Sequence, residues 1–265
     1  MKFSKMEGTG NDFVMVDNRS GIIEDRENTA KRICLRKKGV GADGLLLLEK
    51  SDRADFRMRI LNPDGSEPEM CGNGARCIAR FAYLEGIVGR KCCFETLSGL
   101  VSAYMDEEIV KIQMKDPSFL NPSLELSLGD DSYQGCHLDT GVPHFVLFVP
   151  EIERISLEKL GPEIRYHQSF QPTGTNVDFV EVEKSFLKVR TYERGVEAET
   201  LSCGTGVTAA AIVASLIHGL SSPIGVKTRG GNLKVHFQTK DKTSFTRVFL
   251  EGEARLVYQG EYNES

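Results

Sequence analysis

The sequence predicts an α/β (α+β) protein made of two copies of one unit, each a mixed, largely antiparallel sheet wrapped around a central helix. Three repeated strings indicate the duplication. Cys71-Gly72-Asn73-Gly74 returns as Cys203-Gly204-Thr205-Gly206, an interval of 132 residues. Thr96-Leu97-Ser98-Gly99 and Thr228-Arg229-Gly230-Gly231 are separated by the same interval. Residues 8–16 and 174–182 share the pattern G-T-x-x-D-F-V-x-V. Repeats in one order are hard to obtain by chance.

Each copy places an alternating strand before its cysteine turn and an apolar helix after it. The strands cover residues 56–62 and 187–193. The first helix carries apolar residues at i, i+3, i+4 and i+7 and is expected to end at Gly86, a suitable C′ residue. The second is apolar on almost every side and ends near Gly219, which predicts burial. Other strands are expected over residues 45–48, 101–105, 109–114, 145–149, 233–237, 248–250 and 254–258.

The boundary between the copies is expected near two prolines. Pro117 and Pro122 flank a segment that we interpret as a linker. Composition alone does not assign the strand at residues 254–258 to either half. At 265 residues the chain is long enough for two units that each bury a core.

Composition and charge exclude several classes of function. The formal charge is −5 and the pI is near 5.7, which argues against a nucleic-acid partner or an anionic membrane surface. The N-terminal residues lack the apolar region of a signal peptide, and the longest apolar stretch, at residues 209–217, is too short to span a bilayer. The seven cysteines, an odd number, favour reduced thiols in the cytoplasm. Neither the cysteines nor the histidines have the spacing of a metal site, so no metal is expected.

The two cysteine turns carry the predicted chemistry. A thiol at a helix N-terminus has its anion stabilised by unpaired backbone N–H groups and by the helix dipole. Inversion of a carbon centre by proton transfer needs a base on one face and an acid on the other. Cys71 and Cys203 could supply this pair, one as thiolate and the other as thiol. The glycines that follow them allow backbone N–H groups to approach a carboxylate and the enolate-like species that forms from it, without a cofactor.

Other polar residues lie at the ends of the strands that precede the cysteines. Asn62 begins the turn Asn62-Pro63-Asp64-Gly65, and Glu193-Arg194-Gly195 occupies the equivalent place in the second copy. An arginine suits a second carboxylate, and a glutamate suits an ammonium group. His144 precedes an apolar strand, where a lone histidine is more often a hydrogen-bonded structural residue.

Together these strings resemble the diaminopimelate epimerase family over almost the whole chain. The matching strings include Gly10-Asn11-Asp12-Phe13-Val14, Asn62-Pro63-Asp64-Gly65-Ser66-Glu67, Gly174-Thr175-Asn176-Val177-Asp178-Phe179, Tyr192-Glu193-Arg194-Gly195 and both cysteine strings. The resemblance implies cofactor-independent interconversion of L,L- and meso-diaminopimelate, for lysine and peptidoglycan synthesis. It implies two pseudo-symmetric domains, residues 1–116 plus 252–265 and residues 117–251, with the active site in the cleft between them. It also implies a homodimer.

The resemblance assigns a role to each matching residue. Cys71 and Cys203 would be the acid/base pair. Gly72, Asn73, Gly204 and Thr205 would hold the reacting carboxylate. The distal end of the substrate would be bound by Asn11, Asn62, Asn176 and Arg194, and Glu193 would meet an ammonium group. His144 would lie beside the site, which reverses the structural interpretation given above.

Two departures from the family pattern leave alternatives open. Val142 stands where family members usually carry asparagine, and the segment from Glu193 to Cys203 is one residue longer than in many members. A related two-thiol racemase of histidine, proline or lanthionine type is the nearest alternative. A redox dithiol protein is another, although it would usually carry C-x-x-C. A non-catalytic amino-acid-binding module is the third, although both thiols are retained here.

Overall fold

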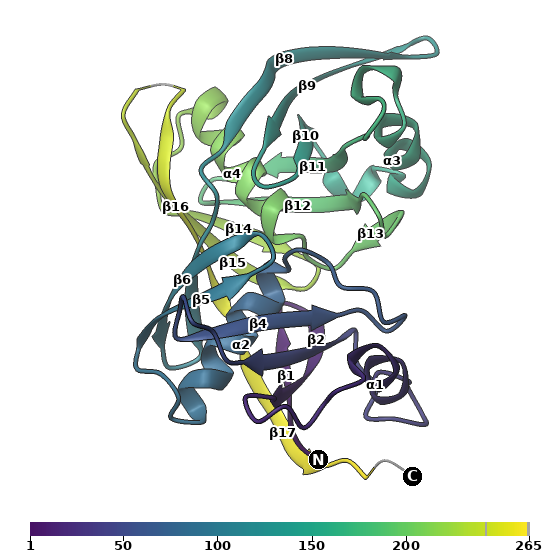
Figure 1. The fold of residues 1–265 in the computed structure, drawn as a ribbon. Helices are drawn as coiled ribbons and strands as arrows, with labels where there is room; N and C mark the ends of the chain where they lie inside the picture. Colours follow the sequence, from purple (N-terminus) through teal and green to yellow (C-terminus); the bar gives the residue numbers. More distant parts are fainter. Residues whose placement is uncertain (242, 264–265) are drawn as a thin grey trace. The chain divides into compact units, whose positions relative to one another are not determined.

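The computed structural model describes residues 1–241 and 243–263, which divide into two compact units (Figure 1). Unit 1 contains residues 1–113 with 251–265, and unit 2 contains residues 114–250. None of the helices among the described residues is long and apolar enough to cross a membrane.

Unit 1 is a mixed sheet around one central helix. Strand β1 pairs with both β2 and β17 in antiparallel fashion, so the C-terminal strand belongs to the sheet of this unit. The order then runs β2 parallel to β3, β3 antiparallel to β4, β4 parallel to β5, and antiparallel β5–β6–β7. The elements are β1 (Lys2–Gly8), β2 (Asn11–Asp17), α1 (Arg26–Ile33), β3 (Gly44–Glu49), β4 (Phe56–Leu61), α2 (Gly72–Leu84), β5 (Lys91–Thr96), β6 (Gly99–Asp106), β7 (Ile109–Gln113) and β17 (Arg255–Glu261).

Unit 2 repeats this order of strands. Here β10 is parallel to β11, β11 antiparallel to β12, β12 parallel to β14, and β14 antiparallel to β15. The elements are β8 (Ser118–Leu128), β9 (Asp131–Asp139), β10 (Pro143–Phe148), η1 (Ile152–Arg154), α3 (Leu157–Arg165), η2 (Gln168–Phe170), β11 (Asn176–Val182), β12 (Phe186–Glu193), β13 (Ala198–Thr200), α4 (Gly204–His218), β14 (Ile224–Thr228), β15 (Gly231–Thr239) and β16 (Phe245–Glu253), whose last residues lie in unit 1.

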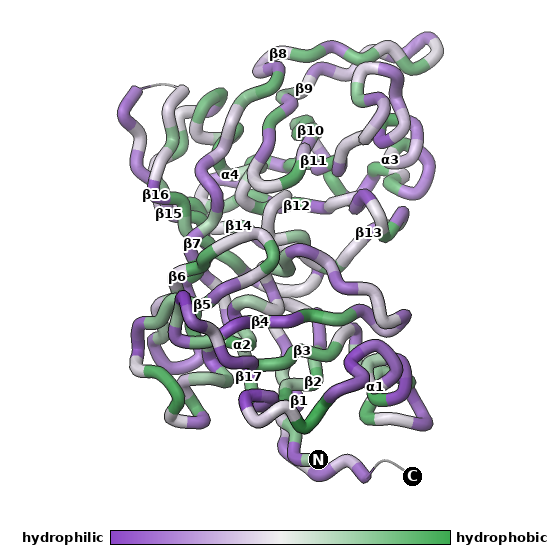
Figure 2. The backbone as a smooth tube through the Cα atoms, viewed as in Figure 1, coloured by the Kyte–Doolittle hydropathy of each residue, from purple (hydrophilic) through white to green (hydrophobic). Residues whose placement is uncertain are grey.

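The central helices are buried as the sequence predicts. Helix α4 is buried from Val207 to Ala214 and ends at Gly219, which has a left-handed backbone (φ 66°). Helix α2 is buried from Asn73 to Ala82, on more sides than its amphipathic pattern suggests, because Arg76 and Arg80 are buried as well. In each unit the sheet strands pack around the helix, and Figure 2 colours the continuous apolar run of β3 beside α2 in green. The predicted fold class is therefore confirmed.

The structure preserves the 132-residue interval at two places. The β5–β6 turn pairs Thr96 with Gly99, and the β14–β15 turn pairs Thr228 with Gly231. In both turns the threonine hydroxyl donates to the glycine carbonyl, at 2.9 and 3.1 Å respectively. These turns and the cysteine caps mark the same positions in the two copies.

Two sequence interpretations were wrong. The match between residues 8–16 and 174–182 joins strands that are not equivalent. Residues 11–17 form β2, whereas residues 176–182 form β11, whose neighbours make it the counterpart of β3. Secondly, the segment between Pro117 and Pro122 is not a linker. It begins β8, whose pairing with β9 shifts register around Pro122 because proline cannot donate a ladder hydrogen bond.

Candidate functional site

In unit 1, Cys71 caps the N-terminus of α2. Its extended backbone (φ −140°, ψ 116°) turns the chain into the helix, and its Sγ accepts the N–H of Gly74 at 3.4 Å. The same sulfur lies 3.7 Å from Oδ1 of Asn11, and the Asn11 amide donates to Asp43 at 2.8 Å. Backbone N–H groups and the helix dipole at this position favour a thiolate.

A buried cation lies beside this cap. The Arg76 side chain is fully buried, and burial lowers its pKa, an effect opposed by attraction to the anionic form of nearby thiols, including Cys71. The guanidinium donates to neutral oxygens: Asn73 Oδ1 and Thr9 Oγ1 at 2.9 Å, and the carbonyls of Gly72 and Glu253 at 3.4 Å. An arginine bonded to neutral acceptors keeps its positive charge available to an adjacent anion.

The side chains of the other unit 1 candidates form hydrogen bonds with neighbouring side chains. Asn73 is buried, and its Oδ1 accepts from Thr9 as well as Arg76, so its side chain is used inside the unit. The Asn62 amide donates to Ser66 at 2.9 Å within the turn that follows β4. The structure therefore places the Asn11 side chain against Cys71, whereas those of Asn62 and Asn73 have hydrogen bonds elsewhere.

In unit 2, Cys203 caps the N-terminus of α4 with a similar backbone (φ −105°, ψ 112°). The thiol is 8% exposed, and its Sγ lies 3.3 Å from the Thr205 hydroxyl. Burial raises the pKa of Cys203 well above its ordinary value, and the negative charges of Glu193 and Asp178 raise it further, while the contact with Thr205 opposes the rise. This environment favours the neutral thiol.

His144 connects this cap to a buried carboxylate. The imidazole is completely buried, with Nδ1 2.6 Å from Asp178 Oδ2 and Nε2 2.9 Å from Thr205 Oγ. The Thr191 hydroxyl donates to the other Asp178 oxygen at 2.7 Å. Neither Asp178 nor Thr191 was predicted as a functional residue from the sequence. The available signal was a single carboxylate inside the apolar run Val177 to Val180.

The remaining unit 2 candidates lie where β11 and β12 meet. The Asn176 carboxamide accepts the N–H of Arg194 at 2.8 Å and donates to the Pro143 carbonyl at 2.9 Å. It thus links the arginine to the strand that carries His144. The Arg194 guanidinium donates to the Thr173 carbonyl at 3.3 Å. Burial raises the pKa of Glu193, and the nearby Thr200 side chain partly offsets this rise.

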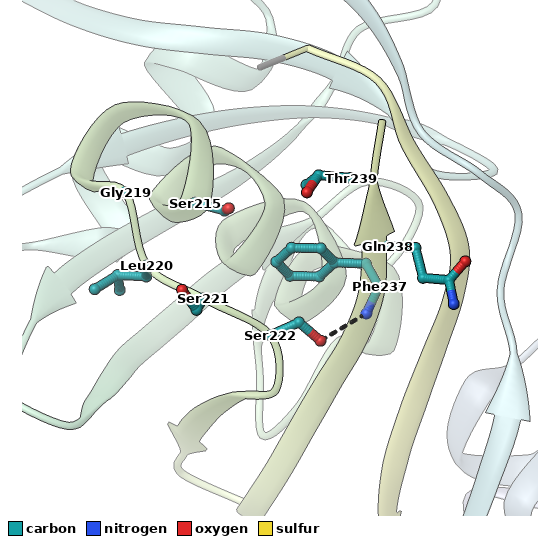
Figure 3. A pocket seen from close by; sticks show the side chains of 8 residues that line it. All are labelled: Ser215, Gly219, Leu220, Ser221, Ser222, Phe237, Gln238 and Thr239. Atoms are coloured by element: carbon teal, nitrogen blue, oxygen red, sulfur yellow. Dashed lines mark hydrogen bonds between the residues drawn. The ribbon is translucent and has the colours of Figure 1, made fainter. Parts of the chain in front are cut away.

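A pocket of about 620 Å³ lies elsewhere in unit 2 (Figure 3). Its lining residues are Ser215, Gly219, Leu220, Ser221, Ser222, Phe237, Gln238 and Thr239, none of which is ionisable. Helix α4 has 15 residues, so its two ends are roughly 20 Å apart, and this pocket lies at the end opposite Cys203. Because its lining has no ionisable side chain, this pocket offers no acid or base for proton transfer. Within residues 1–241 and 243–263, no cluster of three histidine, cysteine or carboxylate side chains has a geometry suited to a metal ion.

The chain matches a family model across most of its length. The model describes diaminopimelate epimerase and matches residues 3–120 and 136–257. A diaminopimelate epimerase from Aquifex aeolicus is 45% identical over 280 aligned positions, covering 100% of this chain and 98% of that relative. One from Flavobacterium psychrophilum is 40% identical, covering 98% of this chain and 99% of that relative.

Solved structures with low sequence identity share the fold. A Bacillus anthracis phenazine biosynthesis protein of the PhzF family matches with a TM-score of 0.76 at 17% identity, covering 100% of this chain and 99% of its own. A probable proline racemase from Agrobacterium radiobacter matches with a TM-score of 0.72 at 16% identity, covering 100% of this chain and 93% of its own. These similarities are similarities of fold.

Proposed function

Because this chain belongs to the diaminopimelate epimerase family, we propose that it interconverts L,L- and meso-diaminopimelate by moving one α-hydrogen between the two faces of the carbon. The observation that carries the proposal is that each of two equivalent units presents a cysteine as the N-cap of its central helix. Equivalent thiols in a duplicated fold supply the two similar groups that inversion requires.

In the proposed mechanism, one thiolate removes the α-hydrogen and the other thiol supplies a hydrogen to the opposite face. Cys71 lies at a helix N-terminus near the buried cation Arg76, and Cys203 has surroundings that favour the thiol. In one direction of reaction Cys71 is therefore the base and Cys203 the acid, and the reverse direction exchanges these roles. A positioned acid or base contributes about 10²–10⁴-fold to the rate.

The helix starts also suit the substrate carboxylate. Backbone amides of Gly72, Asn73, Gly204 and Thr205 belong to the first turns of α2 and α4, where N–H groups and the dipole attract anions. The same donors would stabilise the additional negative charge that develops when the α-hydrogen leaves. The mechanism therefore asks for no cofactor.

The distal end of the substrate carries a carboxylate and an ammonium group, so it needs both positively and negatively charged partners. We propose that Arg194 and the amides of Asn11, Asn62 and Asn176 bind this distal end. We also propose that Glu193 meets an ammonium group, because its buried carboxyl would gain a positive partner there. Val142 contributes no hydrogen-bonding side chain at the start of β10, so the racemase of another amino acid is kept as the alternative to be tested.

Deuterium exchange tests the proposal directly. Purified protein, without added metal or pyridoxal phosphate, should exchange the α-hydrogen of diaminopimelate with D₂O and should epimerise it. Histidine, proline and lanthionine, offered in the same assay, should exchange far more slowly. Exchange of one of these at the higher rate would transfer the proposal to that substrate.

Cysteine variants test the roles of the two thiols. Cys71→Ala and Cys203→Ala should each lower net epimerisation by at least 10²-fold. Cys77→Ala is the matched control, because Cys77 is a buried thiol of the same helix and its counterpart in α4 is already Ala209. Full turnover by the doubly substituted Cys71/Cys203 variant would refute the two-thiol mechanism.

Three further properties are proposed with the function. Oxidation that joins Cys71 to Cys203 should inactivate the enzyme reversibly, because neither sulfur could then carry a proton. We also propose a cytoplasmic location, in keeping with the seven thiols, and assembly as a homodimer. Light scattering on the purified protein tests the dimer, and a monomeric mass at assay concentrations would contradict it.

A further inference from the structure

A continuous row of buried side chains runs from β12 to the N-terminus of α4. The Thr191 hydroxyl contacts Asp178 at 2.7 Å, and Asp178 contacts His144 at 2.6 Å. His144 contacts the Thr205 hydroxyl at 2.9 Å, and this hydroxyl lies 3.3 Å from the sulfur of Cys203. The row begins at Thr191, and each following group contacts the one before it and the one after it until the sulfur is reached. Asp178 and His144 are completely buried.

The chemistry of these groups gives the row one direction. A carboxylate only accepts hydrogen bonds, so both Thr191 O–H and His144 Nδ1–H donate to Asp178. A neutral imidazole with its hydrogen on Nδ1 has a lone pair on Nε2, which accepts the O–H of Thr205. The Thr205 oxygen then has a lone pair facing Cys203 and accepts the S–H. This direction follows from the hydrogen-bonding capacity of the groups and from their contact distances alone.

Unit 1 has apolar side chains at the equivalent positions. Asp178 pairs with Thr191 across β11 and β12, and the matching pair across β3 and β4 is Leu46 with Ile60. His144 lies beside Asn176 at the start of a parallel pair, where unit 1 has Phe13 beside Gly44. The fold is therefore built without polar groups at these places, so the row of unit 2 is not a requirement of the fold.

The glycine in each helix start confirms the equivalence and shows how close the carboxylate lies. A Cβ on Gly74 would meet the Leu46 side chain at 3.4 Å, an ordinary contact. A Cβ on Gly206 would meet Asp178 Oδ1 at 2.3 Å. Asp178 thus lies directly under the first turn of α4, at the place that Leu46 occupies under α2.

We propose that Asp178 is a positioning residue for Cys203, acting through His144 and Thr205. This inference rests on the proposed function. When Cys203 serves as base, its S–H bond breaks as an O–H bond forms on Thr205, whose own hydrogen moves to His144 Nε2. The products are a thiolate and an imidazolium, with the Asp178 carboxylate holding the positive ring. The thiolate then takes the α-hydrogen, and the ring returns its extra proton to solvent after the product leaves.

Nitrogen NMR of the histidine rings gives a test that does not depend on activity. The wild-type signals of His144, assigned by their loss in His144→Gln, should show the Nδ1–H tautomer. In Asp178→Asn the amide can donate to Nδ1, so the ring should change to the Nε2–H tautomer. An Nε2–H tautomer in the wild type, or an unchanged tautomer in a folded Asp178→Asn variant, would overturn the proposal.

Kinetics provide the second arm. Asp178→Asn should lower kcat by about 10²-fold or more while KM changes less than about threefold, because the ring's orientation is altered and the substrate contacts are retained. Thr191→Val is the matched control. It removes one hydrogen bond to the same carboxylate but leaves the His144 contact, and it should lower kcat less than about tenfold. Near-wild-type kcat in a folded Asp178→Asn variant would overturn the proposal. If that variant does not fold, the wild-type tautomer decides.

The two arms separate this inference from the proposed function. If wild-type protein fails to exchange the α-hydrogen of every amino acid offered, the function is wrong whatever the tautomer. If exchange occurs and the wild-type ring carries its hydrogen on Nε2, the function stands and the role of Asp178 is wrong.

Discussion

The starts of α2 and α4 have the same backbone plan but opposite electrostatic surroundings. Both helices begin after a cysteine in extended conformation, and both continue through two glycines. Behind Cys71 lies the buried cation Arg76, whose counterpart in α4 is the neutral Thr208. Behind Cys203 lies the carboxylate of Asp178, whose counterpart in unit 1 is Leu46.

The electrostatics of a duplicated helix cap are thus set by the residues that lie beneath it. Arg76 donates to the carbonyl of Gly72, and Thr208 donates to the carbonyl of Gly204 at 2.8 Å. The two side chains therefore bind the equivalent backbone carbonyl in each helix. They differ in charge. A positive group favours a neighbouring thiolate, and a negative group favours a thiol. Two identical side chains thereby acquire the complementary protonation states that a two-base reaction needs.

The largest effect is expected from adding a methyl group to each helix start. Gly206→Ala should destabilise the protein by about 1–3 kcal/mol, because the new Cβ would overlap with Asp178, and it should lower kcat by displacing that carboxylate. Gly74→Ala meets only ordinary contacts and should lie within about 1 kcal/mol of wild type, since alanine also favours the helix. Urea unfolding measures the change in the free energy of unfolding of both variants. Equal losses of unfolding free energy in the two variants would show that the two helix starts do not differ in this way.

Alkylation sharpens the electrostatic contrast. Without substrate at pH 7, iodoacetamide should modify Cys71 about tenfold faster than Cys203, because thiolate is the reactive form and burial raises the pKa of Cys203. The modification of Cys203 should accelerate only at alkaline pH, since its pKa is raised. Peptide mass spectrometry follows both rates. In Glu193→Gln, which removes one of the charges that raise the pKa of Cys203, its modification should become faster. No change in that variant would count against the role of Glu193.

The smallest effect concerns stability at the site. Burial raises the pKa of Glu193, so its ionisation disfavours the folded state. Wild-type stability is therefore fully present below the unfolded pKa near 4.3 and is reduced as pH rises through the folded value. Glu193→Gln should have a Tm higher by about 2–4 °C at pH 7, which corresponds to ~1 kcal/mol, and the difference should close toward pH 4. A constant difference across this range would show that the charge is not its cause.

The parts of the molecule that could be predicted from the sequence are those encoded locally. The cysteine-glycine strings predicted both central helices and their ends, because cap, glycine turn and apolar run are adjacent in the chain. The roles of Asp178 and Arg76 could not be predicted from local sequence in this way. Their roles depend on β11 lying under α4 and on α2 being buried on all sides, which are contacts between distant segments.

The wrong alignment of residues 8–16 with 174–182 has the same origin. In both segments Gly-Thr comes shortly before a strand rich in apolar residues, so their sequences match. Only the pairing of strands places residues 176–182 in the position of β3. The turn at Thr96 and Gly99 aligned correctly because both of its hydrogen-bonded residues lie within four positions.

The C-terminal segment has a consequence for biosynthesis. Glu253 and Ala254 supply backbone carbonyls to the buried guanidiniums of Arg76 and Arg80, and β17 then pairs with β1. On the ribosome, the first unit to start emerging must wait for these residues, because each of its two buried guanidiniums has one acceptor that is translated last. Unit 2 is a single contiguous stretch, so the half that is translated second is the half able to finish folding first.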